Sequence, residues 1–152
     1  MESKSLTKVI QVYSREDQNG KETRITNVLA NIYREADGYI EGHGRDLATF
    51  LQGIRIENGF VPLASKKIVD GACSLAVQII VHLQKTTGNI YLEPIDEDRY
   101  GQQYEYHITV DEDIGTIEMK IVDVRHKKTI FEGKPDELMK KLKTMPRKHN
   151  LN

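Results

Sequence analysis

A glycine-rich turn carries the residues of this chain that are best placed to do chemistry. Its sequence is Gly42-His43-Gly44-Arg45, and it precedes a segment with the apolar spacing of a helix. Glycines at a helix start let backbone N–H groups converge on one small volume, and the helix dipole adds positive potential there. Arg45 adds a planar cation that can form two parallel hydrogen bonds to a phosphate. The turn therefore predicts either a phosphate site or an ordinary helix cap with exposed His43 and Arg45 side chains.

Acidic residues beside His43 suggest acid–base chemistry as an alternative. Asp37 and Glu41 both come shortly before His43 in the chain, and a histidine with a carboxylate can transfer protons. A metal site usually needs three or four ligands in a closed arrangement. Only one histidine is local, so we expect no metal and no cofactor. Tyr39 lies on the same turn, where its ring could stack on a nucleotide base, and we expect it to be a functional residue.

Nucleophilic chemistry has no comparable signature in the sequence. The single cysteine, Cys73, falls beside the apolar stripe of a predicted helix and is expected to be a small buried side chain. Ser65 and Ser74 lack the context of a nucleophile elbow. Neither a Walker A motif nor a dinucleotide fingerprint occurs. This pattern favours a binding protein over an enzyme.

Strand-like and helix-like segments follow one another in an order typical of an α+β domain. Strands are predicted at 6–13, 24–34, 54–56, 89–92, 104–110, 116–125 and 129–131, and helices at 47–51, 66–85 and 136–142. Asn19-Gly20 predicts the hairpin turn between the first two strands. We expect an α+β fold: an antiparallel sheet with two main helices packed on one face and a C-terminal β-hairpin.

The helix at 66–85 has the clearest pattern, an apolar stripe with a period of about 3.6 residues. Ser65 is its expected N-cap, and Lys66 and Lys67 fall in its first turn. Positive charge opposes the helix dipole at that end. These two lysines are therefore either solvated or face an anion.

Net charge, hydropathy and cysteine content exclude several functions. A formal net charge of -1 gives no overall field that would attract a nucleic acid polymer or an anionic membrane. The longest apolar run, 75–83, is too short to cross a bilayer, and no signal-peptide apolar region follows the N-terminus. One cysteine cannot form an intrachain disulfide, which indicates a reducing compartment. We expect one cytoplasmic domain over residues 1–152, with a frayed basic tail at about 145–152.

The segment 34–51 resembles a family of small phage proteins. It contains Asp-Gly-Tyr at 37–39, Gly-His-Gly at 42–44, and a short predicted helix that ends in Phe50-Leu51. We identify this pattern with the type-one Thoeris anti-defence family, whose members sequester a cyclic ADP-ribose isomer made by bacterial TIR-domain enzymes. The motif covers only 34–51, and the expected order of elements agrees with the family over most of the chain.

The resemblance implies non-catalytic binding of a small cyclic nucleotide in the host cytoplasm. It also implies homo-oligomers built from dimers with pockets near subunit interfaces, and some family members bind cyclic oligonucleotides as well. By position alone, Asn89 or Tyr91 after the long helix and Arg125 in the C-terminal hairpin are candidates for further ligand contacts. The expected ligand-binding residues are then Tyr39, Gly42, His43, Gly44, Arg45, Asn89, Tyr91 and Arg125.

Three functions remain open from the sequence. The first is a protein that binds and sequesters the messenger. The second is an enzyme that cleaves such a messenger, with His43 as acid or base beside Asp37 or Glu41. The third is a protein-binding inhibitor of a host factor that takes no small ligand. If the turn holds a phosphate directly, Arg45→Ala should weaken binding by about 1.5–3 kcal/mol.

Overall fold

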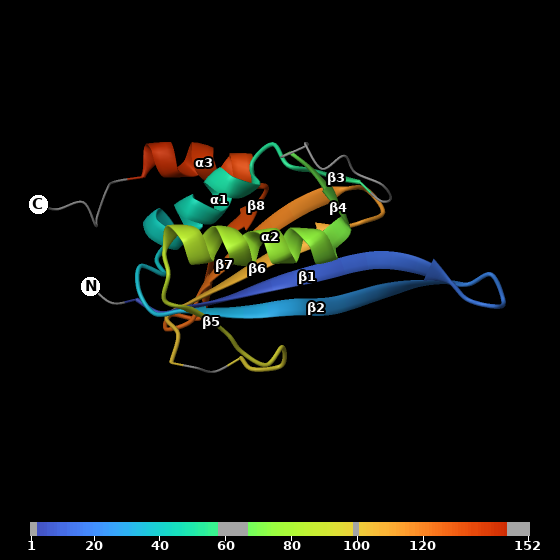
Figure 1. Cartoon of the computed structure of the whole chain (residues 1–152), viewed down its shortest axis with the longest axis horizontal. Helices are drawn as coiled ribbons and strands as arrows, with labels where there is room; N and C mark the ends of the chain where they lie inside the picture. Colours follow the sequence, from blue (N-terminus) through green and yellow to red (C-terminus); the bar gives the residue numbers. More distant parts are fainter. Residues whose placement is uncertain (1–2, 58–66, 99–100, 146–152) are drawn as a thin grey trace, which may run out of the picture.

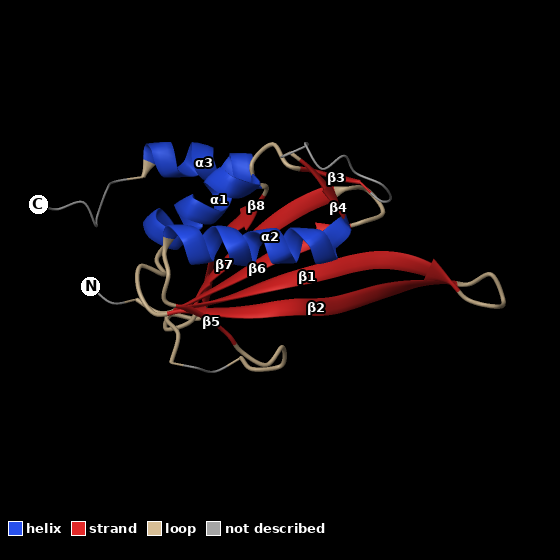
Figure 2. Ribbon diagram, in the orientation of Figure 1, coloured by secondary structure: helices blue, strands red, loops and turns tan. Residues whose placement is uncertain are grey.

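A six-stranded sheet and a layer of helices on one of its faces make up the fold (Figures 1 and 2). The computed structural model describes residues 3–57, 67–98 and 101–145. In these ranges the α-helices are α1 (Arg45–Leu51), α2 (Gly71–Thr86) and α3 (Pro135–Thr144). The strands are β1 (Ser5–Glu16), β2 (Glu22–Arg34), β3 (Arg55–Glu57), β4 (Ile68–Asp70), β5 (Ile90–Leu92), β6 (Tyr104–Asp111), β7 (Thr116–Asp123) and β8 (Lys128–Gly133). The predicted α+β class is confirmed, as is the C-terminal hairpin, which β7 and β8 form.

The large sheet has the strand order β5-β2-β1-β6-β7-β8. Its neighbouring strands are antiparallel except for β1 and β6, which run parallel. Gly20, with a φ of 77°, occupies the left-handed conformation that the turn between β1 and β2 requires. The hairpin formed by β1 and β2 extends past the ends of the other strands (Figure 1).

The predicted start of the long helix was wrong, because α2 begins at Gly71. Residues 68–70 form β4, which pairs in parallel with β3. The β-branched side chains of Ile68 and Val69 suit a strand, and Gly71 turns the chain with a φ of 75°. Lys67 therefore lies outside the helix, and its Nζ donates to the carbonyl oxygen of Gln52 at 3.2 Å. Ser65 and Lys66 lie outside the described residues.

A carboxylate from a distant turn replaces the expected cap of this helix. Glu112, which follows β6, accepts the backbone N–H of Ala72 with Oε2 at 2.8 Å. Its other oxygen accepts a hydrogen bond from the Gln11 side chain at 3.0 Å. A carboxylate at a helix N-terminus is favoured by both the free N–H groups and the dipole. Glu112 thereby connects the start of α2 to the sheet.

The hydrophobic core lies between α2 and the sheet. Leu75, Ile79 and Leu83 from α2 are fully buried, as are Ile108 and Ile121 from the sheet. The outer face of α2 is different, because Cys73 is exposed. The expectation that Cys73 is buried was wrong: it lies beside the buried stripe and faces outward. No helix in the described ranges is long and apolar enough to span a bilayer.

Candidate functional site

The glycine-rich turn is buried at Ile40, His43 and Gly44 and half-buried at Glu41 and Gly42. Residues Ile40–Gly44 form one π-helical turn that leads directly into α1. The His43 side chain within it has no solvent exposure. Its Nε2 lies 2.7 Å from Thr7 Oγ1 on β1, and its Nδ1 lies 2.8 Å from a terminal nitrogen of Arg34 at the end of β2. The ring also meets that of Tyr106 edge to face, with centroids 4.7 Å apart.

The glycines of the turn permit this close packing. A Cβ on Gly42 would lie 2.7 Å from the carbonyl oxygen of Asp37, and one on Gly44 would lie 3.2 Å from Ile40 Cγ1. Two backbone N–H groups donate within the turn: that of Gly42 to Tyr39 O and that of His43 to Asp37 O, both at 3.0 Å. The need for glycine at these positions is thus explained by packing against the chain's own atoms.

The hydrogen bonds of His43 determine its tautomer. A guanidinium can only donate, so Nδ1 of His43 must accept from Arg34 and Nε2 must carry the proton that is donated to Thr7. Burial, and secondly the charge of Arg34, hold the pKa of His43 well below its usual value. His43 is therefore neutral in the folded protein.

Acid should destabilise the protein through His43. In the unfolded chain this histidine gains its proton near pH 6.5, whereas in the folded protein it stays neutral well below that pH. Its contribution is complete above about pH 6.5 and is lost as the pH falls further, because there only the unfolded state gains the proton. We expect a slope of up to about 1.4 kcal/mol per pH unit. Urea unfolding at pH 7 and pH 5.5 measures this change in the free energy of unfolding. If a His43→Gln variant shows the same pH dependence as the wild type, His43 is not the group responsible.

A groove opens beside the turn, where β6 begins and β7 ends. Its volume is about 520 Å³. It is lined by Ile40, Glu41, Tyr104, Asp123, Lys128, Thr129, Ile130, Lys141 and Met145. A recess of about 100 Å³ shares Tyr104 and Asp123 with it and is also lined by Ser3, Tyr39, Gln103, Arg125 and His126. We call the groove and the recess together the Tyr104 groove.

Two phenols in this groove remain protonated. Burial raises the pKa of Tyr104, and the negative charges of Asp123 and Glu41 raise it further. Burial likewise raises the pKa of Tyr39, assisted by Asp37, whose carboxylate accepts the Tyr39 hydroxyl at 3.3 Å. Tyr104 therefore offers a hydroxyl donor and an aromatic face, whereas Tyr39, whose hydroxyl donates to Asp37, offers its aromatic face.

Charged groups of both signs surround these rings. Burial opposes ionisation of Asp123, but hydrogen bonds from the His126 backbone N–H (3.1 Å) and Nδ1 (2.8 Å) hold its pKa below the usual range. Asp123 therefore stays ionised. Arg125 and Lys128 are exposed cations at the end of the hairpin, and Lys141 reaches the groove from α3. Lys141 Nζ donates to the carbonyl oxygen of Ile130 at 2.7 Å. Aromatic faces next to cations can hold a ligand with a flat base and phosphate groups.

The structure brings two of the predicted ligand-binding residues together, because Tyr39 and Arg125 line the same recess. Gly42, His43 and Gly44 are not among the residues that line the recess or the groove in the described part of the chain. Arg45 opens α1 and donates from Nε to the carbonyl oxygen of Glu41 at 3.3 Å. It does not line the groove among the described residues.

Asn89 and Tyr91 lie at the other edge of the sheet. Tyr91 is on β5, where its ring centroid is 6.2 Å from that of Tyr33 on β2. Asn89 precedes β5, and its carbonyl oxygen accepts the backbone N–H of Glu35 at 3.4 Å. The strands β2, β1 and β6 separate β5 from β7, which places β5 roughly 19 Å from β7, the strand that Arg125 follows, at about 4.8 Å per strand. The structure does not bring them together with Arg125.

Several groove residues were not singled out from the sequence: Asp123, Lys128 and Lys141. From the sequence, His126, Lys127 and Lys128 indicate only the turn of the C-terminal hairpin. Its basic composition next to a strand that ends in Asp123 is the one local signal that could have marked the site. Lys141 comes from a separate helix, and no local pattern connects it to the hairpin.

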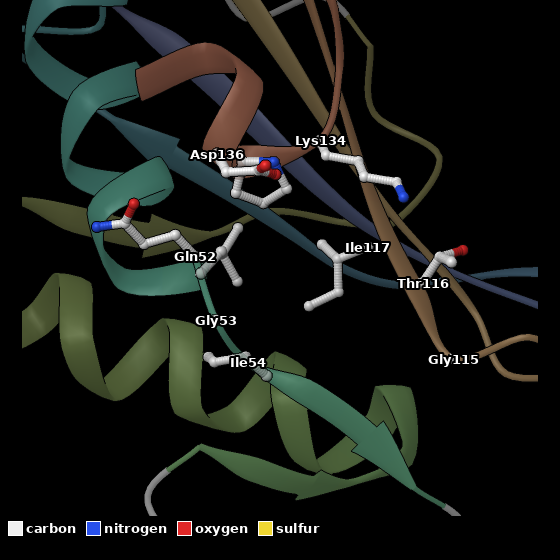
Figure 3. A pocket seen from close by; sticks show the side chains of 10 residues that line it. Gln52, Gly53, Ile54, Gly115, Thr116, Ile117, Lys134 and Asp136 are labelled. Carbon is white, nitrogen blue, oxygen red and sulfur yellow. The ribbon is translucent and has the colours of Figure 1, made fainter. Parts of the chain in front are cut away.

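A second depression, of about 180 Å³, lies between the end of α1, the turn before β7 and the start of α3 (Figure 3). Lys134 and Asp136 bring opposite charges to it. No aromatic ring lines it among the described residues. The backbone N–H of Lys134 is occupied by Glu137 Oε1 at 2.9 Å. The Tyr104 groove therefore suits a nucleotide better than this depression does.

Within the described part of the chain, no three His, Cys, Asp or Glu side chains are grouped as a metal site requires. No protein-family model, curated protein or solved structure matches the sequence or the fold. The residues of the Tyr104 groove and the motif at 34–51 are therefore the grounds for inferring a function.

Proposed function

We propose that this chain is a phage anti-defence protein that sequesters a cyclic ADP-ribose isomer in the Tyr104 groove and so blocks TIR-based signalling in the host cytoplasm. One observation carries the proposal: Tyr39 and Arg125, both expected to bind ligand, line one recess together with Tyr104. These residues come from the turn, the hairpin and the start of β6. Their convergence supports a shared role in binding.

The chemistry of the groove supports this ligand class. A cyclic ADP-ribose isomer carries one adenine, two phosphates and ribose hydroxyls. The rings of Tyr39 and Tyr104 can stack on the base, and the cations of Arg125, Lys128 and Lys141 can pair with phosphates. A volume of about 520 Å³ falls within the usual range for small-molecule sites. Sequestration needs no nucleophile and no metal.

The alternative of an enzyme that uses His43 has less support. An acid or base must come within hydrogen-bond reach of the substrate. The His43 ring is fully buried, and both of its nitrogens are bonded to Thr7 and Arg34. Asp37 bonds to Tyr39. The geometry therefore favours a structural role for His43.

A homo-oligomer is part of the same proposal. Val77 and Val81 lie one turn apart on the outer face of α2 and are 60% and 46% exposed. Together with the exposed Cys73 they form an apolar stripe, a feature typical of a protein contact. Sedimentation of the purified chain distinguishes a dimer or an assembly of dimers from a monomer.

Ligand depletion tests the function. The protein is mixed with the cyclic ADP-ribose isomer from a TIR-domain enzyme, the free ligand is removed by filtration, and the retained complex is heated to release what it holds. We expect depletion of the free messenger and recovery of intact ligand. Altered ligand indicates cleavage instead. If the free messenger is not depleted, both sequestration and cleavage are contradicted, and a protein-binding inhibitor remains. The Arg45→Ala variant serves as a control and should deplete the messenger like the wild type.

A further inference from the structure

The turn that carries Tyr39 is held by side chains that do not line the Tyr104 groove. The Tyr106 hydroxyl donates to the carbonyl oxygen of Gly38 at 2.6 Å, directly before Tyr39. Arg34 donates from Nε to the carbonyl oxygen of Ala36 at 2.7 Å. His43 fixes the other end of the turn through Thr7 and Arg34. Tyr39 therefore lies between restraints on both sides.

Close packing leaves this turn little freedom. The N–H of Gly38 donates to the carbonyl oxygen of Ser3 at 2.8 Å. A Cβ on Gly38 would lie 2.8 Å from that same oxygen, and one on Gly42 would lie 3.2 Å from Cε2 of Tyr39. The Tyr39 ring thus packs directly over Gly42. A displacement of the turn would move this ring.

Burial makes the network costly to rearrange. His43 has no exposed surface, Tyr106 is 1% exposed and Arg34 is 9% exposed. A buried guanidinium without its acceptors is strongly disfavoured. Within the described residues, none of the ion pairs involves Arg34. Its charge is accommodated by His43 and by the carbonyl oxygen of Ala36, so this one arrangement is favoured.

We propose that Tyr106, His43 and Arg34 are positioning residues, which hold Tyr39 in the orientation that binds ligand in the Tyr104 groove without touching the ligand themselves. This inference rests on the proposed function, because it names the part of the fold on which the affinity of that groove depends. Among the described residues, the turn between β2 and α1 contributes Tyr39 to the recess, and the buried polar network bonds to the backbone of that same turn.

A double-mutant cycle tests the proposal. Tyr106→Phe removes only the hydroxyl that bonds to Gly38, and Tyr39→Ala removes the ring that is positioned. Calorimetry with a TIR-produced cyclic ADP-ribose isomer should give an affinity about fivefold lower for the first variant and about tenfold lower for the second. The double variant should bind no more weakly than Tyr39→Ala, because Tyr106 then has nothing to position. Tyr13→Phe, on β1 beyond its pairing with β6, also removes one tyrosine hydroxyl; it is the matched control and should bind like the wild type.

The proposal is overturned if Tyr106→Phe binds the ligand as tightly as the wild type does. It is also overturned if Tyr106→Phe lowers the affinity as much in the Tyr39→Ala background as in the wild type. Hydrogen exchange tests the positioning role separately from the proposed function. The amides of Gly42 and His43 should exchange about tenfold faster in Tyr106→Phe, while those of β7 should not change. If the wild type does not bind the messenger, the proposed function fails. In that case, faster amide exchange in the turn of Tyr106→Phe still supports the positioning role of Tyr106. Unchanged exchange overturns the positioning role.

Discussion

Replacing Arg125 by alanine should lower the affinity for the cyclic ADP-ribose isomer by about 10- to 150-fold. Arg125 lines the recess with Tyr39 and Tyr104, and its side chain is exposed. A hydrogen bond from a charged donor contributes about 1.5–3 kcal/mol, which gives this range. The exposed position means that folding should hardly be affected. Isothermal titration calorimetry with the purified variant measures the change.

Arg45→Ala is the matched control, because it also removes one arginine close to the turn. Arg45 bonds to the carbonyl oxygen of Glu41 and does not line the Tyr104 groove among the described residues. Because the substitution removes no group that lines the groove, we expect the affinity to stay within about twofold of the wild type. A strong loss with Arg45→Ala and none with Arg125→Ala would place the phosphate at the start of α1 and not in the groove.

His43→Leu should reduce the free energy of unfolding by about 3 kcal/mol. Leucine removes the acceptor of the buried Arg34 guanidinium and the donor to the buried Thr7 hydroxyl. Leaving a buried polar group unsatisfied costs about 1–3 kcal/mol for each group, and more for a charged one. Urea denaturation followed by circular dichroism measures the loss.

His43→Gln provides the comparison for that variant. A glutamine amide can accept from Arg34 with its oxygen and donate to Thr7 with its nitrogen. We expect a loss of about 1 kcal/mol, a typical value for an imperfectly replaced hydrogen bond. If leucine is tolerated as well as glutamine, the buried network does not contribute to stability as proposed.

Local patterns predicted most of the fold. Alternation along 104–110 and 116–125 gave β6 and β7 with their buried faces, and Asn19-Gly20 gave the hairpin of β1 and β2. What could not be predicted depends on contacts between distant residues. The parallel pairing of β1 with β6 joins segments about a hundred residues apart. The start of α2 depends on β3 and on Glu112, which a helical pattern alone cannot reveal.

Part of the candidate site could likewise be predicted from the sequence, and part could not. Tyr39 and Arg125 could be named from the sequence, although only the structure shows that they share a recess. The environment of His43 could not be foreseen, because its partners Thr7, Arg34 and Tyr106 come from three different strands. An isolated histidine between glycines fits an exposed cap and a packed interior equally well. The ligand contacts that the resemblance implies for Asn89, Tyr91 and the turn at 42–45 are not tested by the structure, and binding in the Tyr104 groove does not require them.

An NMR titration tests the central claim most directly. The labelled protein is titrated with the TIR-produced cyclic ADP-ribose isomer, and the ligand is examined again after release. We expect shifts at Tyr39, Tyr104 and Arg125, small changes at Tyr91, and ligand signals identical before binding and after release. Shifts confined to β5, or a released ligand with altered signals, would contradict sequestration in the Tyr104 groove.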